Sequence, residues 1–383
     1  MEDLITFVPM EHEILTPDDG AQYFFGYYDM RADDGTGRHL CHRVRFADRL
    51  PTAHDIAELG YVKERRFYRF AETTAWNFQQ GAMLEYHPTE KNTVFFNTVK
   101  DGGLVTATLN FETGAVRYAD RATACHSADG KWGLAVDFGR IFDFRPGYGY
   151  AGFPDRNAAA AAPAGDGVFL TDLTTGSSRL LFSLADLAPA SGFAPGEKLL
   201  VNHITFSPDS NRFLFLLRNF PNGKTPWLTT LMVGDRTGQV YPVLKATYVS
   251  HYYWLNDAEI VAHCTVPSLG EKKSMYRLNV LTVEAVEYDM PYFGQFPNGD
   301  IHCRLSADGE TVIGDGYEFG GYRRLVEYRI ATGASRVLFA AASPKPACLD
   351  IRCDLHIRPV SGGWVSYDTT ERGKREIARY RLK

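Results

Sequence analysis

The sequence lacks the features that would place it in several common classes of protein. None of its six cysteines forms a CxxC pair, and no run of 18 apolar residues occurs. The first stretch, MEDLITFVPMEHEIL, has no basic region followed by a long apolar core. These absences argue against a membrane span and against a signal peptide. Without export, we expect the cysteines to be reduced, and a cytoplasmic location is the default expectation.

Excess charge of one sign and nucleotide motifs are also missing. The net charge is −5, so charge gives no reason to expect binding to nucleic acid or to an anionic membrane. The sequence has no GxSxG elbow, no P-loop and no GxGxxG between a strand and a helix. Serine-hydrolase and nucleotide chemistry are therefore disfavoured.

The chain does have a repeat in which a turn is followed by a run of apolar, β-favouring residues. The turns are centred near residues 34, 89, 129, 209, 257, 308 and 362. Seven units averaging about 50 residues predict an all-β fold, a seven-bladed β-propeller, as a single domain over residues 1–383. The longest spacing contains a Gly/Pro/Ala-rich stretch, which predicts a loop insertion at 145–167. Residues 5–16 are expected to add a strand to the last blade and so close the ring.

Histidine is scarce, with 11 residues in the chain, yet four occupy one position in four successive repeats. Each lies six residues before its turn: His203, His251, His302 and His356. Equivalent positions in a ring of blades face one another across its centre, so these imidazoles should converge. A single histidine at such a position would more often have a structural role, at the end of an inner strand and hydrogen-bonded to neighbouring backbone. Four together favour a functional site.

Imidazoles that converge are typical ligands of a divalent transition metal. We expect His302 and His356 to bind the ion, with His203 and His251 nearby as candidate catalytic groups. Asp354 lies two residues before His356, on the same side if the strand is extended, and would complete the ligand set. Mixed oxygen and nitrogen ligands favour Mn²⁺, Fe²⁺ or Zn²⁺, and Ca²⁺ is not excluded.

Further candidates are expected on the same face of the ring. Arg218 and Arg352 offer planar forks for a carboxylate, which suggests an acidic ligand, although either could form a structural ion pair. Tyr28 takes the histidine position in the first repeat and could stack on a sugar, although such aromatics are more often core. Gln80 could contact hydroxyls, and the insertion, which carries Tyr148, could form a wall of the site.

The segments IHCRLSADGETVIGDGY, HITFSPDSNRFLFLLR and SHYYWLNDAEIV resemble blades of the oligogalacturonate lyases, and the resemblance extends from about Tyr23 onward. These bacterial seven-bladed propellers cleave short uronic-acid oligosaccharides by β-elimination with a bound Mn²⁺. The resemblance implies that His302 and His356 bind metal. It also implies that His251 is the base and that Arg218 lies near the substrate carboxylate. Family members tend to have His-Pro-His where this chain has Asp354-Leu355-His356, and the family's glutamine ligand has no clear match.

We therefore expect a metal-dependent lyase that acts on an acidic oligosaccharide or polysaccharide. The alternative is a non-catalytic propeller that binds a glycan or a protein, and a hydrolase that uses metal-activated water is third. The sequence leaves open which uronic acid is bound, whether chain ends or interiors are cut, and the oligomeric state.

Overall fold

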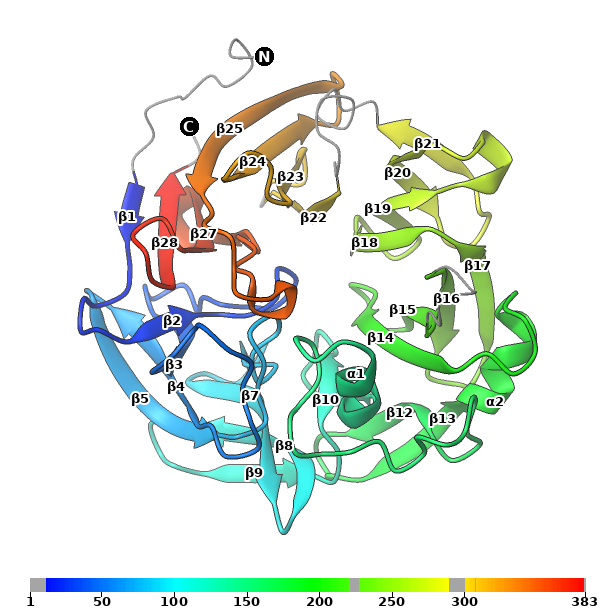
Figure 1. The fold of residues 1–383 in the computed structure, drawn as a ribbon, viewed down its shortest axis with the longest axis horizontal. Coiled ribbons are helices and arrows are strands. Elements are labelled where there is room, and N and C mark those ends of the chain that lie inside the picture. The colour runs from blue at the N-terminus through cyan, green and yellow to red at the C-terminus, as the bar shows by residue number, and fades with distance from the viewer. Residues whose placement is uncertain (1–11, 221–226, 289–299, 307, 382–383) are drawn as a thin grey trace.

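The computed structural model describes residues 12–220, 227–288, 300–306 and 308–381. Seven four-stranded antiparallel sheets are arranged around a common axis, as the blades of a seven-bladed β-propeller (Figure 1). In each blade the first strand of the repeat is innermost and later strands lie progressively farther out. The predicted fold class is therefore confirmed.

Six blades are built from four consecutive strands, and the seventh takes one strand from the other end of the chain. The blades are β2 (Gln22–Phe24), β3 (His39–Val44), β4 (Ala57–Lys63), β5 (Arg66–Thr73); β6 (Glu85–Tyr86), β7 (Thr93–Lys100), β8 (Gly103–Asn110), β9 (Val116–Ala119); β10 (Thr123–His126), β11 (Trp132–Ala135), β12 (Gly167–Asp172), β13 (Ser178–Ser183); β14 (Leu199–Phe206), β15 (Arg212–Asn219), β16 (Thr229–Asp235), β17 (Val240–Thr247); β18 (Val249–Trp254), β19 (Glu259–Thr265), β20 (Lys273–Asn279), β21 (Ala285–Tyr288); β22 (Ile301–Leu305), β23 (Thr311–Gly316), β24 (Tyr322–Arg329), β25 (Ala334–Ala342); and β26 (Arg358–Val360), β27 (Trp364–Thr369), β28 (Glu376–Arg381), β1 (His12–Ile14).

The ring closes through β1, as the sequence predicted. His12, Glu13 and Ile14 pair antiparallel with β28 near the C-terminus, so the first and last parts of the chain share one blade. The remainder of the predicted closing segment divides between residues 5–11, which lie outside the described residues, and residues 15 and 16, which follow β1. Pairing with β28 satisfies the backbone groups that an open edge would leave without partners.

Each predicted turn lies between the first and second strands of a blade, and three of the turns share a side-chain bond between a serine and an aspartate. Asp129 accepts a hydrogen bond from Ser127 Oγ at 2.6 Å, and Asp209 accepts the equivalent bond from Ser207 at 2.6 Å. Both aspartates also accept backbone N–H groups two residues later. This side-chain mimicry of a turn is why Ser-x-Asp recurs at these positions.

The insertion in the third blade begins earlier than we expected. The chain leaves β11 at Ala135 and forms the helix α1 (Phe138–Phe144), which the sequence analysis did not predict. Asp137 caps α1 by accepting from the N–H groups of Gly139 and Arg140. Short helices also occur at Leu184–Leu187 (α2), Ala188–Ala190, Pro267–Leu269, Leu349–Ile351 and Ser361–Gly363.

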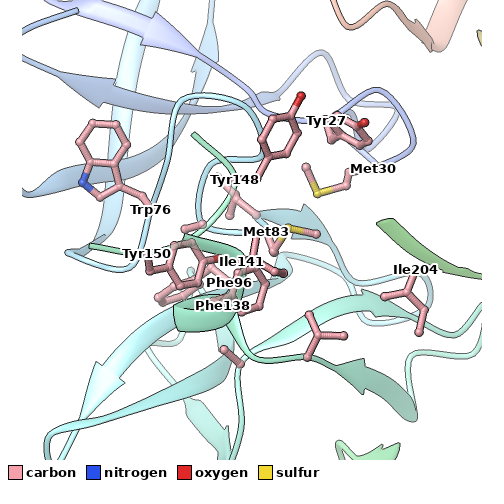
Figure 2. Close-up of a cluster of buried hydrophobic side chains, with 14 of the residues drawn as sticks. Tyr27, Met30, Trp76, Met83, Phe96, Phe138, Ile141, Tyr148, Tyr150 and Ile204 are labelled. Carbon is pink, nitrogen blue, oxygen red and sulfur yellow. The ribbon is translucent and has the colours of Figure 1, made fainter. Parts of the chain in front are cut away.

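Arg140 fastens the insertion to the propeller. Its buried guanidinium pairs with Asp155 at 2.7 Å and donates to the carbonyls of Ala160, Ala161 and Leu199. Figure 2 shows a buried apolar cluster in which Phe138 and Ile141 of α1 lie beside Tyr150. The rings of Phe138 and Tyr150 stack with centroids 4.3 Å apart. The insertion is thus packed on the blades.

Two further observations concern cysteine and membrane features. All six cysteines are free, and Cys303 is buried in the core. Among the described residues, no helix has both the length and the apolar character needed to span a bilayer.

Candidate functional site

The four repeated histidines converge around one buried tyrosine. The ring centroid of Tyr28 lies 5.7 Å from that of His203, 6.1 Å from His251, 5.4 Å from His302 and 6.4 Å from His356. The imidazoles of His251 and His302 are 4.2 Å apart, and those of His302 and His356 are 4.5 Å apart. The convergence predicted from the repeat position is therefore present.

Two of these histidines have backbone conformations that non-glycine residues rarely adopt. The φ angle is +44° at His203 and +43° at His356, both in the left-handed region. At His203 the pairing register of β14 and β15 shifts, so this residue is the extra one of a bulge. His356 lies in an irregular segment before β26 rather than in the extended strand that we expected. Such strain concentrates at functional sites, where it redirects a side chain.

His302, His356 and Asp354 form a group with the composition of a metal site. One ligand atom from each lies within 4.8 Å of the others, and all three residues are buried. Ligand atoms around one ion bonded at about 2.1 Å are roughly 3–4 Å apart, so binding would need only a small inward movement. Two imidazoles and one carboxylate on one side of an ion suit Mn²⁺, Fe²⁺ or Zn²⁺.

Hydrogen bonds at Nδ1 hold both imidazoles in the tautomer that leaves Nε2 able to bind a metal. His302 Nδ1 lies 3.1 Å from a carboxylate oxygen of Asp315, and His356 Nδ1 lies 2.9 Å from the carbonyl oxygen of Gly26. Both partners only accept, so each Nδ1 carries the hydrogen and each Nε2 keeps its lone pair. Both Nε2 atoms are buried without a partner. Burial, reinforced by His302, lowers the pKa of His356 well below its usual range, which keeps this ring neutral.

Asp354 is also held by two arginines. Arg323 Nη1 lies 2.5 Å from one of its carboxylate oxygens, and Arg352 Nε lies 2.8 Å from the other. Burial alone would raise the pKa of Asp354, but these two cations hold it well below its usual range. The carboxylate is therefore ionised whether or not an ion is bound.

A cavity of about 390 Å³ lies next to this group, between the insertion and the fourth to sixth blades. Its lining includes two of the four histidines, three cations and several aromatic side chains: Tyr27, Arg145, Tyr148, Asn202, His203, Arg218, Trp227, Thr229, Tyr248, Val249, Ser250, His251, Lys273, Asp300 and Tyr317. Figure 2 shows Tyr27 and Tyr148 at one side of the apolar cluster. The insertion thus forms part of the wall, as the sequence suggested.

His251 is the best-placed proton acceptor in the cavity. Its Nδ1 lies 3.0 Å from Asp300, whose carboxylate is also 2.9 Å from Nδ1 of His263. Burial alone would raise the pKa of Asp300, but His251 and His263 hold it well below its usual range. The bond to Asp300 places the hydrogen of His251 on Nδ1 and leaves Nε2 as the acceptor. Burial lowers the pKa of His251 to about 4, so the ring is neutral at pH 7.

Arg218 is a buried cation that lines the cavity without a carboxylate partner among the described residues. Its Nη2 has only long contacts, 3.4 and 3.5 Å, to the carbonyls of Val249 and Ser250, and its Nε is buried without a partner. Burial and the nearby Arg145 lower its pKa to about 10, so it remains charged at neutral pH. An anionic ligand would satisfy this guanidinium.

The other predicted site residues are arranged as follows. Arg352 is paired with Asp354 and donates to Tyr148 Oη at 2.8 Å, so it lies one side chain behind the cavity. Tyr28 is fully buried, and its hydroxyl donates to the carbonyl of Tyr252. Gln80 lines a small void beneath the cavity rather than the cavity itself. Neither Tyr28 nor Gln80 is among the residues that line the main cavity.

His203 connects two cavities. It lines the main cavity, and its Nε2 lies 3.1 Å from Asp29. Asp29 in turn lines a second cavity of about 260 Å³, toward the end of the inner strands where the turns lie. The Nδ1 of His203 is buried without a partner. His203 is thus placed at the floor of the main cavity.

Asp300 is the functional candidate that the sequence analysis missed. It lies two residues before His302, as Asp354 lies two residues before His356, so Asp-x-His occurs in two successive blades. That repetition was a signal that could have identified it. The two aspartates act on different partners, because Asp300 turns toward His251 of the preceding blade while Asp354 lies beside His302 and His356.

Comparisons with known proteins identify the fold. A scan against models of known protein families gave no match, and a search of functionally described proteins also gave none. The structure is similar to the β-propeller domain of the trilobed protease from Pyrococcus furiosus, with a TM-score of 0.51 and 10% identity over 95% of this chain and 94% of that one. It is also similar to a puromycin-hydrolyzing peptidase from Mycobacterium tuberculosis, with a TM-score of 0.53 and 13% identity over 94% of this chain.

This chain spans only 53% of the length of the mycobacterial peptidase. TolB from Acinetobacter baumannii matches with a TM-score of 0.38 and 12% identity, over 91% of this chain and 65% of TolB. At such low identity the similarities to the protease domain and to the mycobacterial peptidase show the propeller fold alone. The function must be inferred from the site.

Proposed function

We propose that this protein binds a divalent metal ion with His302, His356 and Asp354 and cleaves a uronate-containing glycan by β-elimination in the adjacent cavity. The observation that carries the proposal is the pair of buried, partnerless Nε2 atoms beside an ionised carboxylate. Buried polar atoms without partners are rare, and they are explained here if an ion joins them. When bound, the ion would supply positive charge that makes the proton next to a uronate carboxylate more acidic.

The cavity suits an acidic sugar because of its charge and its aromatic lining. Arg218, Arg145 and Lys273 line it, and Asp300 is the one acidic group among the described lining residues. The carboxylate of Asp300 already contacts two histidines, His251 and His263. We assign the ligand carboxylate to Arg218, because its guanidinium is buried and has no carboxylate partner among the described residues. A charge-assisted bond of this kind is worth about 1.5–3 kcal/mol.

The residues of the cavity are sufficient for the proton transfer. His251 Nε2 removes the proton from C5 of the uronate, the electron pair forms a C4–C5 double bond, and the C4–O bond breaks. The proton on His251 then passes to the leaving oxygen or to solvent, which restores the starting state. Asp300 holds the hydrogen of neutral His251 on Nδ1 and stabilises the ring once it is protonated. The sequence resemblance to oligogalacturonate lyases supports the same reaction type.

The second candidate is a propeller that binds an acidic glycan without metal or catalysis. Arg323 and Arg352 favour this alternative, because their two charges already neutralise Asp354. Both candidates predict binding of an acidic sugar in the same cavity. They differ in whether the bound sugar is cleaved.

The decisive experiment incubates the protein and Mn²⁺ with a panel of glycans that contain 4-linked uronate: polygalacturonate, alginate and hyaluronan. We expect ultraviolet absorbance from the new double bond with at least one of them. His251→Ala should abolish it while Mn²⁺ remains bound. His263→Ala is the matched control, because it also removes a partner of Asp300 but does not line the cavity, and it should retain most activity. Binding without product across the panel would favour the non-catalytic alternative.

A further inference from the structure

Arg352 has two different sets of neighbours, and this carries an inference about how the site is loaded. On one side its Nε lies 2.8 Å from Asp354, the proposed metal ligand. On the other side its Nη2 donates to Tyr148 Oη, and its guanidinium lies 5.6 Å from the ring centroid of Tyr317. Tyr148 and Tyr317 both line the main cavity. We propose that Arg352 leaves Asp354 for the ligand carboxylate when a divalent ion binds, so that the ion and an acidic ligand bind cooperatively. This inference rests on the proposed metal site.

The charges around the site explain why cooperation is needed. Two carboxylates, those of Asp354 and Asp315, and two guanidiniums, those of Arg323 and Arg352, are buried around His302 and His356. A divalent ion would add two positive charges to this buried group. Uncompensated buried charge is costly, so the ion should bind weakly by itself. The carboxylate of a ligand would offset part of the excess.

The contacts of the two arginines indicate which of them moves. Both arginines are tied to the scaffold: Arg323 through Ser343 Oγ at 3.3 Å and the Gly316 carbonyl at 3.4 Å, and Arg352 through the Leu349 carbonyl, to which its Nη1 donates at 3.0 Å. Arg352 differs in that its Nη2 also donates to Tyr148 Oη in the wall of the cavity. Both arginines contact Asp354 by charge alone, since neither of its carboxylate oxygens has a partner with hydrogen-bond geometry. The backbone of Arg352 is fixed through its carbonyl, which accepts from Gln79 at 2.9 Å. Only the side chain of Arg352 therefore needs to move toward the cavity.

The test measures Mn²⁺ binding by electron paramagnetic resonance of the free ion, in the presence and absence of saturating D-galacturonate. Galactose is the control ligand, because it lacks the carboxylate. We expect galacturonate to lower the Kd for Mn²⁺ by about tenfold or more, and Mn²⁺ to lower the Kd for galacturonate by the same factor, because such coupling is reciprocal. Galactose should leave the Kd unchanged.

Two variants separate the movement of Arg352 from its charge. Arg352→Gln and Arg323→Gln each remove one positive charge beside Asp354, so both should tighten Mn²⁺ binding in the absence of sugar. Only Arg352→Gln also removes the side chain that reaches Tyr148. We expect coupling below about threefold for Arg352→Gln and above about tenfold for Arg323→Gln. Thermal melting would verify that both variants fold, and the wild-type measurement tests the cooperation without them.

Four results would overturn the inference or separate it from the proposed function. If the Kd for Mn²⁺ were the same with and without galacturonate, the inference would be overturned, but the proposed metal site would not be. Equal coupling in the two variants would overturn the assigned role of Arg352. Absence of Mn²⁺ binding under all conditions would overturn both proposals. Coupling without cleavage of any glycan would refute the lyase while supporting the inference.

Discussion

Two carboxylates, Asp300 and Asp315, each hold one histidine of the site, and exchanging them for amides should separate catalysis from metal binding. Asp300 orients His251 at 3.0 Å, whereas Asp315 orients His302 at 3.1 Å. Asparagine has nearly the same size and shape as aspartate but loses the charge and one acceptor oxygen. Asp300→Asn should therefore disturb the base, and Asp315→Asn should disturb the metal ligand.

The expected effect of each substitution follows from what the aspartate–histidine pair contributes. A positioned general base contributes about 10²–10⁴ in rate, so Asp300→Asn should lower kcat by about a hundredfold or more, or roughly 3 kcal/mol in activation free energy. Its Mn²⁺ affinity should remain within about threefold, because none of the three ligand residues contacts Asp300. Asp315→Asn should weaken Mn²⁺ binding by about 10–100-fold, the usual effect of losing a partner of a metal-binding histidine.

The assay compares kcat, from ultraviolet absorbance at saturating Mn²⁺, with the Mn²⁺ Kd of each variant. The reasoning predicts that Asp315→Asn regains most of its activity at high Mn²⁺, while Asp300→Asn does not. If Asp300→Asn retained activity within threefold of wild type, His251 could not be a base oriented by Asp300. If both variants lost Mn²⁺ equally, the two pairs would form a single unit, and the separate roles would be refuted.

Three further predictions concern the ligand, the insertion and pH. Arg218→Gln should lower kcat/KM by about 10–100-fold, from the loss of one charge-assisted bond, and saturation kinetics on the cleaved glycan would detect it. Arg140→Met leaves Asp155 buried without its main partner and should cost about 3–5 kcal/mol in the free energy of unfolding, measured by urea denaturation. Burial raises the pKa of Asp166 to about 6 from 3.8, so the protein loses stability as pH rises through that range. Asp166→Asn should therefore raise the melting temperature above pH 6 and change it little below pH 4, and the reverse pattern would contradict the assignment.

The number of blades and the convergence of the histidines could be predicted because both follow from a repeat. In three blades Ser-x-Asp forms the same side-chain turn before the second strand. Once those turns are placed, the residue six positions earlier must lie near the top of an inner strand. His203, His251 and His302 lie in inner strands at these positions.

The details that could not be predicted depend on contacts between distant segments. The helix α1 has seven residues and is held by Arg140, whose partners lie up to 59 residues away in sequence. His356 was expected in an extended strand, but its positive φ depends on packing that no local pattern specifies. Arg352 was expected either to bind the ligand or to form a structural ion pair, and the sequence does not indicate that its partner is Asp354.

The arrangement around Asp300 also bears on whether the cavity binds or cleaves. A binding site for an acidic sugar needs cations and aromatic surfaces, which Arg218 and Trp227 already supply. A binding site does not need a buried carboxylate such as Asp300, which holds the hydrogen of His251 on Nδ1 and leaves Nε2 facing the ligand as an acceptor. Burying Asp300 is costly unless its partners satisfy it, and four side chains do so: Tyr248, Ser250, His251 and His263. Asp300→Asn therefore distinguishes the two candidates, because a binding module should keep its affinity for galacturonate and lose no further property. The lyase should keep the same affinity and lose its turnover.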